Sequence, residues 1–282
     1  MIRRPFGTSG VDVPTIGQGS WNVPARGAAA EESKRALRRG IAAGMTHIDT
    51  AEMYGDGAAE RLVGEAISDI PRAELFLVSK VLPSNASYAG TIAACERSLV
   101  RLGTAYLDCY LLHWRGSFPL RDTLRALEQL VADGKILTLG VSNFDLDDLK
   151  EAHALLEREP LTCNQVLYHL GERTIEAHEV EYCRERGVAI VGYTPFGREE
   201  YADSPGVAVL ERIAEKHGAS VHQTILAFLT RDPIAFAIPK AASVVHVEDN
   251  AGATDVHLDA GDLAAIDRAY PIKTRRGGLP TL

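Results

Sequence analysis

Cysteine is scarce in this chain, and its few cysteines lie far apart. They stand at Cys95, Cys109, Cys163 and Cys183, so no CxxC pair is available to hold a metal or to act as a redox dithiol. The zinc-binding pattern HExxH is absent as well. We therefore expect no metal site, and we interpret the four thiols as reduced and mostly buried.

Long apolar runs and basic clusters are also missing. No stretch approaches the apolar length of a membrane span, and the amino-terminal segment MIRRPFGTSG lacks the apolar run that a secretory signal requires. Lys and Arg form no basic run, and the net charge is −8, which disfavours nucleic acid as a partner. These absences predict a soluble, cytoplasmic protein that binds neither nucleic acid nor a membrane.

The chain does contain a regular alternation of short apolar runs and longer amphipathic segments, which is typical of βαβ units. With 46% hydrophobic and 24% charged residues, its 282 residues have an ordinary globular composition. We expect strands near residues 15–19, 46–48, 75–79, 107–112, 136–141, 163–166, 188–192 and 234–238. We expect helices between them, at 31–43, 91–102, 122–132, 146–156 and 205–216.

This pattern predicts an α/β fold, a single (β/α)8 TIM barrel, and no linker or composition shift divides residues 1–282 into more than one domain. A doubly wound open sheet would show the same alternation, but its GxGxxG fingerprint is missing, as are a Walker loop and GxSxG. The turn signal Gly-Thr-Ser-Gly within residues 3–14 predicts a hairpin that caps one barrel end. Residues 259–270 predict an extra C-terminal helix.

Polar side chains end most of the expected strands. In a barrel of this class the carboxyl ends of the strands form the active site, so these side chains are candidates for chemistry. Each has a structural explanation when taken alone, for example a helix cap at Ser142 or a satisfied core histidine at His113. The set as a whole favours a site, because independent strand ends place polar groups on one rim. Its members are Asp49, Lys80, His113, Ser142, Asn143, Gln165, Tyr193 and Lys240.

The order of several motifs along the chain resembles the aldo-keto reductase family. They run from GQGSW at 17–21 through HIDTAEMYG at 47–55, VSK at 78–80, LHW at 112–114, GVSNF at 140–144 and NQVLYH at 164–169 to IPKA at 238–241. The chain is most similar to bacterial members of methylglyoxal-reductase type. The resemblance implies an NADPH-dependent carbonyl reductase whose catalytic tetrad is Asp49, Tyr54, Lys80 and His113.

The resemblance also implies the cofactor contacts. Ser142, Asn143 and Gln165 would hold the nicotinamide carboxamide, Tyr193 would stack on the nicotinamide ring, and Asp249 and Asn250 would meet the adenine. Lys240 matches the lysine that meets the 2′-phosphate of NADP. The chain departs from the family at Ala241, where serine is common, and at His246, where an arginine often grips the same phosphate. These departures weaken the expected preference for NADPH.

Chemistry supports Tyr54 as the proton donor, because hydride transfer leaves negative charge on the carbonyl oxygen. If the Lys80 ammonium lies about 4 Å from a Tyr54 phenolate, their attraction at an effective dielectric near 20 is roughly 4 kcal/mol. We therefore expect Lys80 to lower the pKa of Tyr54. Asp49 would hold Lys80 charged. A neutral His113 would donate an N–H to the substrate oxygen.

Substrate preference follows from Trp21 and Trp114, which we expect to wall the entrance, and from only 12 residues after Tyr270, which offer few contacts to large substrates. Small reactive carbonyls such as methylglyoxal and aromatic aldehydes are therefore the expected substrates, and family analogy suggests a monomer. Two other functions stay open: an NADP-binding sensor with little turnover, and a phosphate-binding barrel lyase or isomerase.

Overall fold

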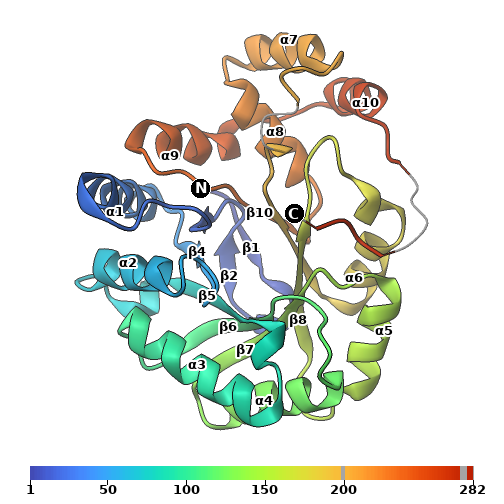
Figure 1. The fold of residues 1–282 in the computed structure, drawn as a ribbon. Helices are drawn as coiled ribbons and strands as arrows, with labels where there is room; N and C mark the ends of the chain where they lie inside the picture. The colour runs from blue at the N-terminus through green and yellow to red at the C-terminus, as the bar shows by residue number, and fades with distance from the viewer. Residues whose placement is uncertain (198–200, 274–277, 282) are drawn as a thin grey trace.

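A computed structural model describes residues 1–197, 201–273 and 278–281. Eight parallel strands stand in the sheet in the order in which they occur in the chain. Bridges from Ile16 to Ala237 and from Gly19 to Lys240 join the first strand to the last, so the sheet curls into the barrel seen in Figure 1. The strands are β3 (Gln18–Gly19), β4 (His47–Asp49), β5 (Phe76–Val81), β6 (Leu107–Leu112), β7 (Ile136–Ser142), β8 (Leu161–Leu167), β9 (Ala189–Tyr193) and β10 (Ala235–Ile238).

The strands are apolar because both of their faces are covered. Every residue of β5, β6 and β8 is buried, as expected for a parallel sheet wrapped by helices. Tyr110 and Leu111 of β6 are among the largest side chains that are fully buried. The predicted (β/α)8 barrel is confirmed.

Ten α-helices surround the barrel in the described part of the chain. Gly103, Gly187 and Gly218 end three of them in the left-handed conformation that glycine adopts without strain. Four helices, α2, α6, α8 and α9, were not among the segments expected from the sequence. The helices are α1 (Gly27–Ala42), α2 (Ala58–Ile67), α3 (Tyr88–Leu102), α4 (Leu120–Ala132), α5 (Leu146–Leu155), α6 (Glu179–Arg186), α7 (Val207–His217), α8 (Val221–Leu229), α9 (Val244–Ala251) and α10 (Ala260–Ala269).

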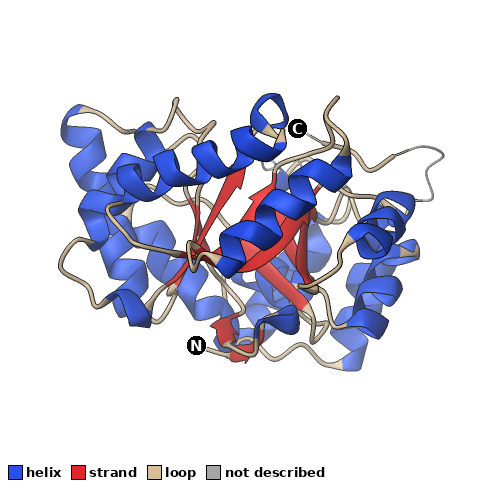
Figure 2. Cartoon of the chain, turned by 90° about the horizontal axis from the view of Figure 1, so that it is seen from below, coloured by secondary structure: helices blue, strands red, loops and turns tan. Residues whose placement is uncertain are grey.

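A small antiparallel hairpin precedes the barrel, as predicted. It pairs β1 (Arg3–Pro5) with β2 (Asp12–Pro14) and lies at one end of the barrel in Figure 2. Phe6 follows β1, is fully buried, and packs its ring against Phe76 and Phe236 with centroids 4.7 and 5.0 Å apart. Because both partners stand near the start of their strands, the hairpin closes the amino end and leaves the carboxyl end for a site.

Two further features concern the whole chain. All four cysteines are buried and free. Across residues 1–197, 201–273 and 278–281, no helix has both the length and the apolar character that crossing a bilayer would require.

Candidate active site

The polar residues predicted to converge do share one end of the barrel. Parallel pairing places the carboxyl ends of all strands at the same rim, and Asp49, Ser142 and Tyr193 are the last residues of their strands. Register brings neighbours together directly, since Ser142 pairs with Gln165 across β7 and β8. His113 and Lys240 follow β6 and β10 at the same rim.

Asp49, Lys80 and Tyr54 form a connected group in the barrel mouth. The Lys80 ammonium donates to Asp49 Oδ1 at 2.5 Å and to the Thr50 carbonyl at 2.8 Å. It also donates to the Tyr54 hydroxyl at 3.3 Å. Asp49 and Lys80 are almost fully buried, whereas Tyr54 is partly exposed. The ion pair therefore holds a cation against a phenol that faces the opening.

The electrostatics of Tyr54 correct one expectation. Burial raises the pKa of Tyr54, and Lys80 opposes that rise without overcoming it, so the net shift is upward rather than downward. Burial also lowers the pKa of Lys80, but Asp49 and Tyr54 outweigh it and the ammonium stays charged. In the protein without substrate, Tyr54 is accordingly a protonated acid beside a fixed cation.

His113 completes the predicted tetrad. Its ring lies edge-on to that of Tyr54, with centroids 5.9 Å apart. Burial and, secondarily, the Lys80 charge lower the pKa of His113 to about 2, so the imidazole is neutral at physiological pH. Its buried Nδ1 makes no hydrogen bond to the described residues. A neutral imidazole beside Tyr54 matches the role expected of it.

The residues expected at the nicotinamide lie next to the tetrad. Gln165 donates its side-chain amide to Asp49 Oδ2 at 2.7 Å, and Tyr193 donates its hydroxyl to Asn143 Oδ1 at 2.9 Å. The Asn143 amide donates to Ser142 Oγ and to the His113 carbonyl, each at 3.1 Å. Asn143 has φ 62°, a left-handed conformation that asparagine tolerates better than most residues. These amides and hydroxyls fit a carboxamide ligand, and the Tyr193 ring fits a flat heterocycle.

The residues expected at the adenosine end lie around the start and end of α9. Lys240 and His246 are exposed, and the Lys240 ammonium forms no hydrogen bond or ion pair with the described residues. Asp249 accepts from Ser220 Oγ at 3.0 Å, so its carboxylate is tied to α8, and Asn250 is buried. The unpaired Lys240 ammonium is suited to binding a phosphate. The bond from Ser220 shows that Asp249 also stabilises the packing of α9 against the start of α8.

Each tryptophan follows the carboxyl end of a barrel strand by two residues, Trp21 after β3 and Trp114 after β6. Trp21 follows Ser20, whose backbone N–H donates to the Asp49 carbonyl at 3.0 Å. Trp114 is 36% exposed and its ring lies 4.7 Å from that of His113, centroid to centroid. The Trp114 indole therefore lies beside a catalytic candidate, as expected of a residue that walls an entrance, and the Ser20 bond places the Trp21 backbone next to the end of β4.

The fold and this set of side chains prompt a comparison with known proteins. The sequence profile of the aldo/keto reductase family matches residues 15–271. The chain belongs to the aldo/keto reductase family. The resemblance inferred from the motifs is thereby confirmed.

Relatives within the aldo/keto reductases cover nearly the whole chain. Methylglyoxal reductase YeaE of Escherichia coli (strain K12) is 44% identical over 263 residues, 93% of this chain and 92% of that protein. Glyoxal reductase of Bacillus subtilis (strain 168) is 37% identical over 261 residues, 92% and 90% of the two chains. An aldo/keto reductase of Klebsiella pneumoniae, crystallised with NADP and acetate, has a TM-score of 0.93 at 42% identity and covers 99% of both chains.

Sequence reasoning missed several buried polar residues around the tetrad. Glu52 accepts the Leu82 backbone N–H at 2.8 Å. Glu60 is fully buried and accepts from Ser79 Oγ at 2.6 Å, next to Lys80 in β5. Glu52 stands within the HIDTAEMYG motif, so its place between Asp49 and Tyr54 was a usable signal. No comparable sequence signal links Glu60 to Ser79, because the two residues lie on different elements, α2 and β5, and belong to no common motif.

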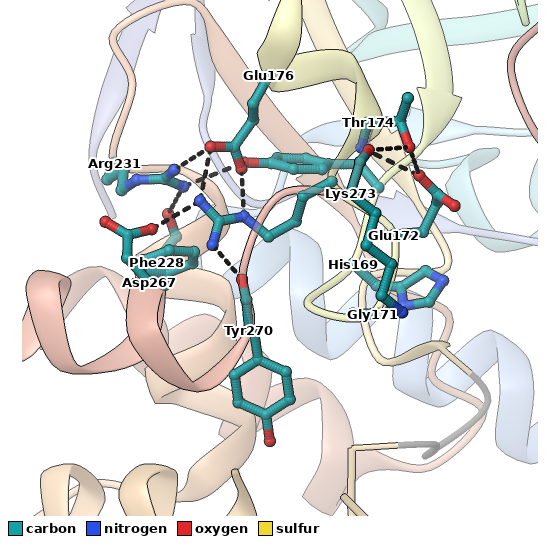
Figure 3. A network of polar contacts seen from close by, with 12 residues as sticks. His169, Gly171, Glu172, Thr174, Glu176, Phe228, Arg231, Asp267, Tyr270 and Lys273 are labelled. Carbon is teal, nitrogen blue, oxygen red and sulfur yellow. Dashed lines mark hydrogen bonds and ion pairs between the residues drawn. The ribbon is translucent and has the colours of Figure 1, made fainter. Parts of the chain in front are cut away.

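A second ion network, the outer network, contains no member of the tetrad and consists of Arg173, Glu176, Arg231 and Asp267 (Figure 3). Arg173 donates to Glu176 and Asp267, in each case at 2.7 Å, and to the Tyr270 carbonyl at 2.6 Å. Arg231 joins Glu176 at 2.6 Å. The network fastens the end of α10 to η4 (Thr174–Ala177).

A cavity of about 300 Å³ lies beside this network. His169, Tyr270 and Lys273 contribute to its lining, and no member of the tetrad does. The catalytic assignment therefore rests on the polar geometry of the barrel mouth and not on this cavity.

Proposed function

We propose that this chain is an NADPH-dependent reductase of small aldehydes and ketones, in which Tyr54 donates the proton. The observation that supports this most is the contact of 3.3 Å between Tyr54 and a lysine paired with a buried aspartate. The Tyr54 hydroxyl donates its own proton to none of the described residues. That proton is accordingly free for a substrate oxygen at the mouth.

The side chains divide the reduction between them. NADPH, when bound, supplies the hydride that the carbonyl carbon accepts. Tyr54 transfers its proton to the carbonyl oxygen, and Lys80 stabilises the phenolate that remains. Asp49 keeps Lys80 charged and aimed. The neutral imidazole of His113 donates an N–H to the carbonyl oxygen and orients it.

The choice of NADPH follows from Lys240. Two structures support it: the Klebsiella pneumoniae enzyme with NADP, and one from the same organism with NADPH, 41% identical and with a TM-score of 0.92. An exposed cation without a protein partner suits the 2′-phosphate that distinguishes NADPH from NADH. Ala241 and His246 remove the hydroxyl and guanidinium often found nearby, so the preference is modest.

The preference for small carbonyls follows from the mouth and from the relatives. Trp21 and Trp114 provide apolar walls that suit a compact carbonyl compound. The Escherichia coli and Bacillus subtilis relatives are named for methylglyoxal and glyoxal. Discrimination between such substrates then depends on carbonyl reactivity and on fit near the tetrad.

A substrate panel tests the proposal. The kcat/KM of the purified protein is measured for methylglyoxal, a nitro-substituted benzaldehyde, a pentose and a ketosteroid, with NADPH and again with NADH. We expect methylglyoxal and the benzaldehyde with NADPH to give the highest values. A pentose or ketosteroid preferred by about tenfold, which is about 1.4 kcal/mol, would contradict the substrate assignment.

The same panel separates the proposal from a sensor. A regulatory barrel would bind NADPH without oxidising it, whatever carbonyl is present. Saturable NADPH binding together with no loss of NADPH absorbance for any of the four compounds would favour the sensor.

A further inference from the structure

Glu52 is a buried carboxylate that the tetrad does not include. It lies in the loop between β4 and α2, between Asp49 and Tyr54 in sequence, and its side chain is only 7% exposed. Burial of a carboxylate is unfavourable unless hydrogen bonds compensate for lost water. The hydrogen-bond partners of the Glu52 carboxylate therefore indicate which segment of the chain it positions.

All of the short bonds of Glu52 go to the chain that directly follows Lys80. Its Oε1 accepts the Leu82 backbone N–H at 2.8 Å and the Asn85 side-chain amide at 2.9 Å. Its backbone N–H donates to the Lys80 carbonyl at 3.4 Å. Arg97 approaches the other carboxylate oxygen at 3.5 Å. Glu52 is thus hydrogen-bonded to the residues on both sides of Val81 at the end of β5, Lys80 and Leu82.

These hydrogen bonds of Glu52 join the loop after β4 to β5, the two elements that carry the contact between Tyr54 and Lys80. Lys80 stands on β5, whereas Tyr54 stands on the loop after β4. The contacts between this loop and the strand end are backbone bonds from Thr50 to Val78 at 2.9 Å and from Glu52 to Lys80 at 3.4 Å, together with the side-chain bonds of Glu52 and Lys80. Tyr54 itself is anchored locally, by a backbone bond of 3.1 Å to Ala51. A displacement of about 1 Å in a catalytic contact can lower the rate about a hundredfold.

We propose that Glu52 is a positioning residue that sets the distance between the Tyr54 hydroxyl and the Lys80 ammonium. The inference rests on the proposed function of Tyr54. Glu52 acts through the two hydrogen bonds accepted by Oε1, and its charge is secondary. Glutamine keeps an acceptor oxygen in the same place, so it replaces Glu52, whereas alanine does not.

The test compares Glu52→Ala with Glu52→Gln in the full-length holoenzyme, using methylglyoxal and NADPH. Glu52→Ala is expected to lower kcat by about tenfold to a hundredfold, with KM and the NADPH Kd little changed. It is also expected to enlarge the solvent deuterium isotope effect on kcat, because proton transfer becomes limiting. Glu52→Gln is expected to retain most of the parent kcat and the parent isotope effect.

Glu128→Ala is the matched control. Glu128 is a carboxylate with a side chain only 2% exposed, and its Oε1 accepts backbone N–H groups of the loop before β8, at the amino end of the barrel. Its loss is expected to lower the unfolding temperature without changing kcat. A kcat loss in Glu128→Ala equal to that in Glu52→Ala would show general destabilisation and overturn the inference.

Tyr54→Phe, measured in parallel, separates this inference from the proposed function. An active Tyr54→Phe would contradict the proposed function itself. An inactive Tyr54→Phe beside a fully active Glu52→Ala would overturn only the positioning role, as would a Glu52→Gln as slow as Glu52→Ala. If Glu52→Ala does not fold, Asn85→Ala removes one of the same bonds from the partner side, and an unchanged kcat there overturns the inference.

Discussion

Tyr54 and Tyr168 both lie beside an arginine or lysine that is paired with a carboxylate, and they differ in where the hydroxyl proton goes. Tyr168 is buried, donates to Glu176 at 2.7 Å and accepts from Arg231 at 3.0 Å. Tyr54 is partly exposed and accepts from Lys80. Burial raises the pKa of both phenols. The two tyrosines therefore differ in whether the hydroxyl proton is already donated to a carboxylate, and this difference is the reason why we propose Tyr54 and not Tyr168 as the proton donor.

A large difference in kcat is expected between variants that remove the cation beside each tyrosine. Lys80→Met is expected to lower kcat by about two to three decades, because the phenolate loses its fixed cation. Arg231→Met is expected to leave kcat unchanged and to lower the free energy of unfolding by about 1–3 kcal/mol, since it leaves buried acceptors unsatisfied. Steady-state kinetics and urea unfolding of both variants measure this. A similar kcat loss in the two variants would show that the two regions do not differ as described.

A smaller effect separates a free cation at the mouth from the paired cations of the outer network. Lys240→Ala is expected to raise the NADPH Kd by about one to two decades, the value of a charge-assisted contact of about 1.5–3 kcal/mol. The NADH Kd is expected to stay near that of the parent, because NADH lacks the 2′-phosphate. Fluorescence titration with both cofactors measures the change. Equal losses for NADPH and NADH would rule out the phosphate contact.

The two regions also differ in the pH range over which each loses stability. The pKa of His113 is lowered to about 2 and that of His47 to about 3, so both stay neutral in the folded protein and protonate only on unfolding. Stability is therefore lost as pH falls below about 6.5, by up to about 1.4 kcal/mol per pH unit for each histidine.

The outer network acts in a lower pH range. Burial would raise the pKa of Glu176, but hydrogen bonds from Arg173 and Tyr168 and the Arg231 charge outweigh it and lower the pKa below its usual 4.5. Its contribution is present above that value and is lost as pH falls through the lowered pKa. Urea unfolding across pH is expected to show a shallower slope in Glu176→Gln only below about 4.5. A changed slope between 4.5 and 6.5 would contradict the assignment.

Much of the barrel mouth could be predicted from the sequence, because strand ends are local features. Apolar runs ending in Asp49, Lys80 or Ser142 give both the strands and the rim, and parallel topology then brings those residues together. A separate local signal, the Gly-Thr-Ser-Gly turn, predicted the hairpin ahead of β3. The local sequence pattern was sufficient to predict the position of a residue wherever that position depends only on the strand that the residue ends.

The rest depended on contacts between distant segments. The net rise in the pKa of Tyr54 could not be predicted, because the sequence shows the Lys80 charge but not the loss of water that outweighs it. The bonds of Glu52 to the chain after β5 and of Arg173 to α10 also join elements far apart in sequence. Such bonds appear only when the packing of the elements is known.

The most direct test of the account is Tyr54→Phe measured beside Tyr168→Phe, with turnover and NADPH affinity determined on the same preparations. Removing the Tyr54 hydroxyl is expected to lower kcat for methylglyoxal by about two to four decades while the NADPH Kd stays unchanged. Removing the Tyr168 hydroxyl is expected to lower the unfolding temperature and leave kcat unchanged. A Tyr54→Phe that reduces methylglyoxal at close to the parent rate would contradict the assignment of Tyr54 as proton donor.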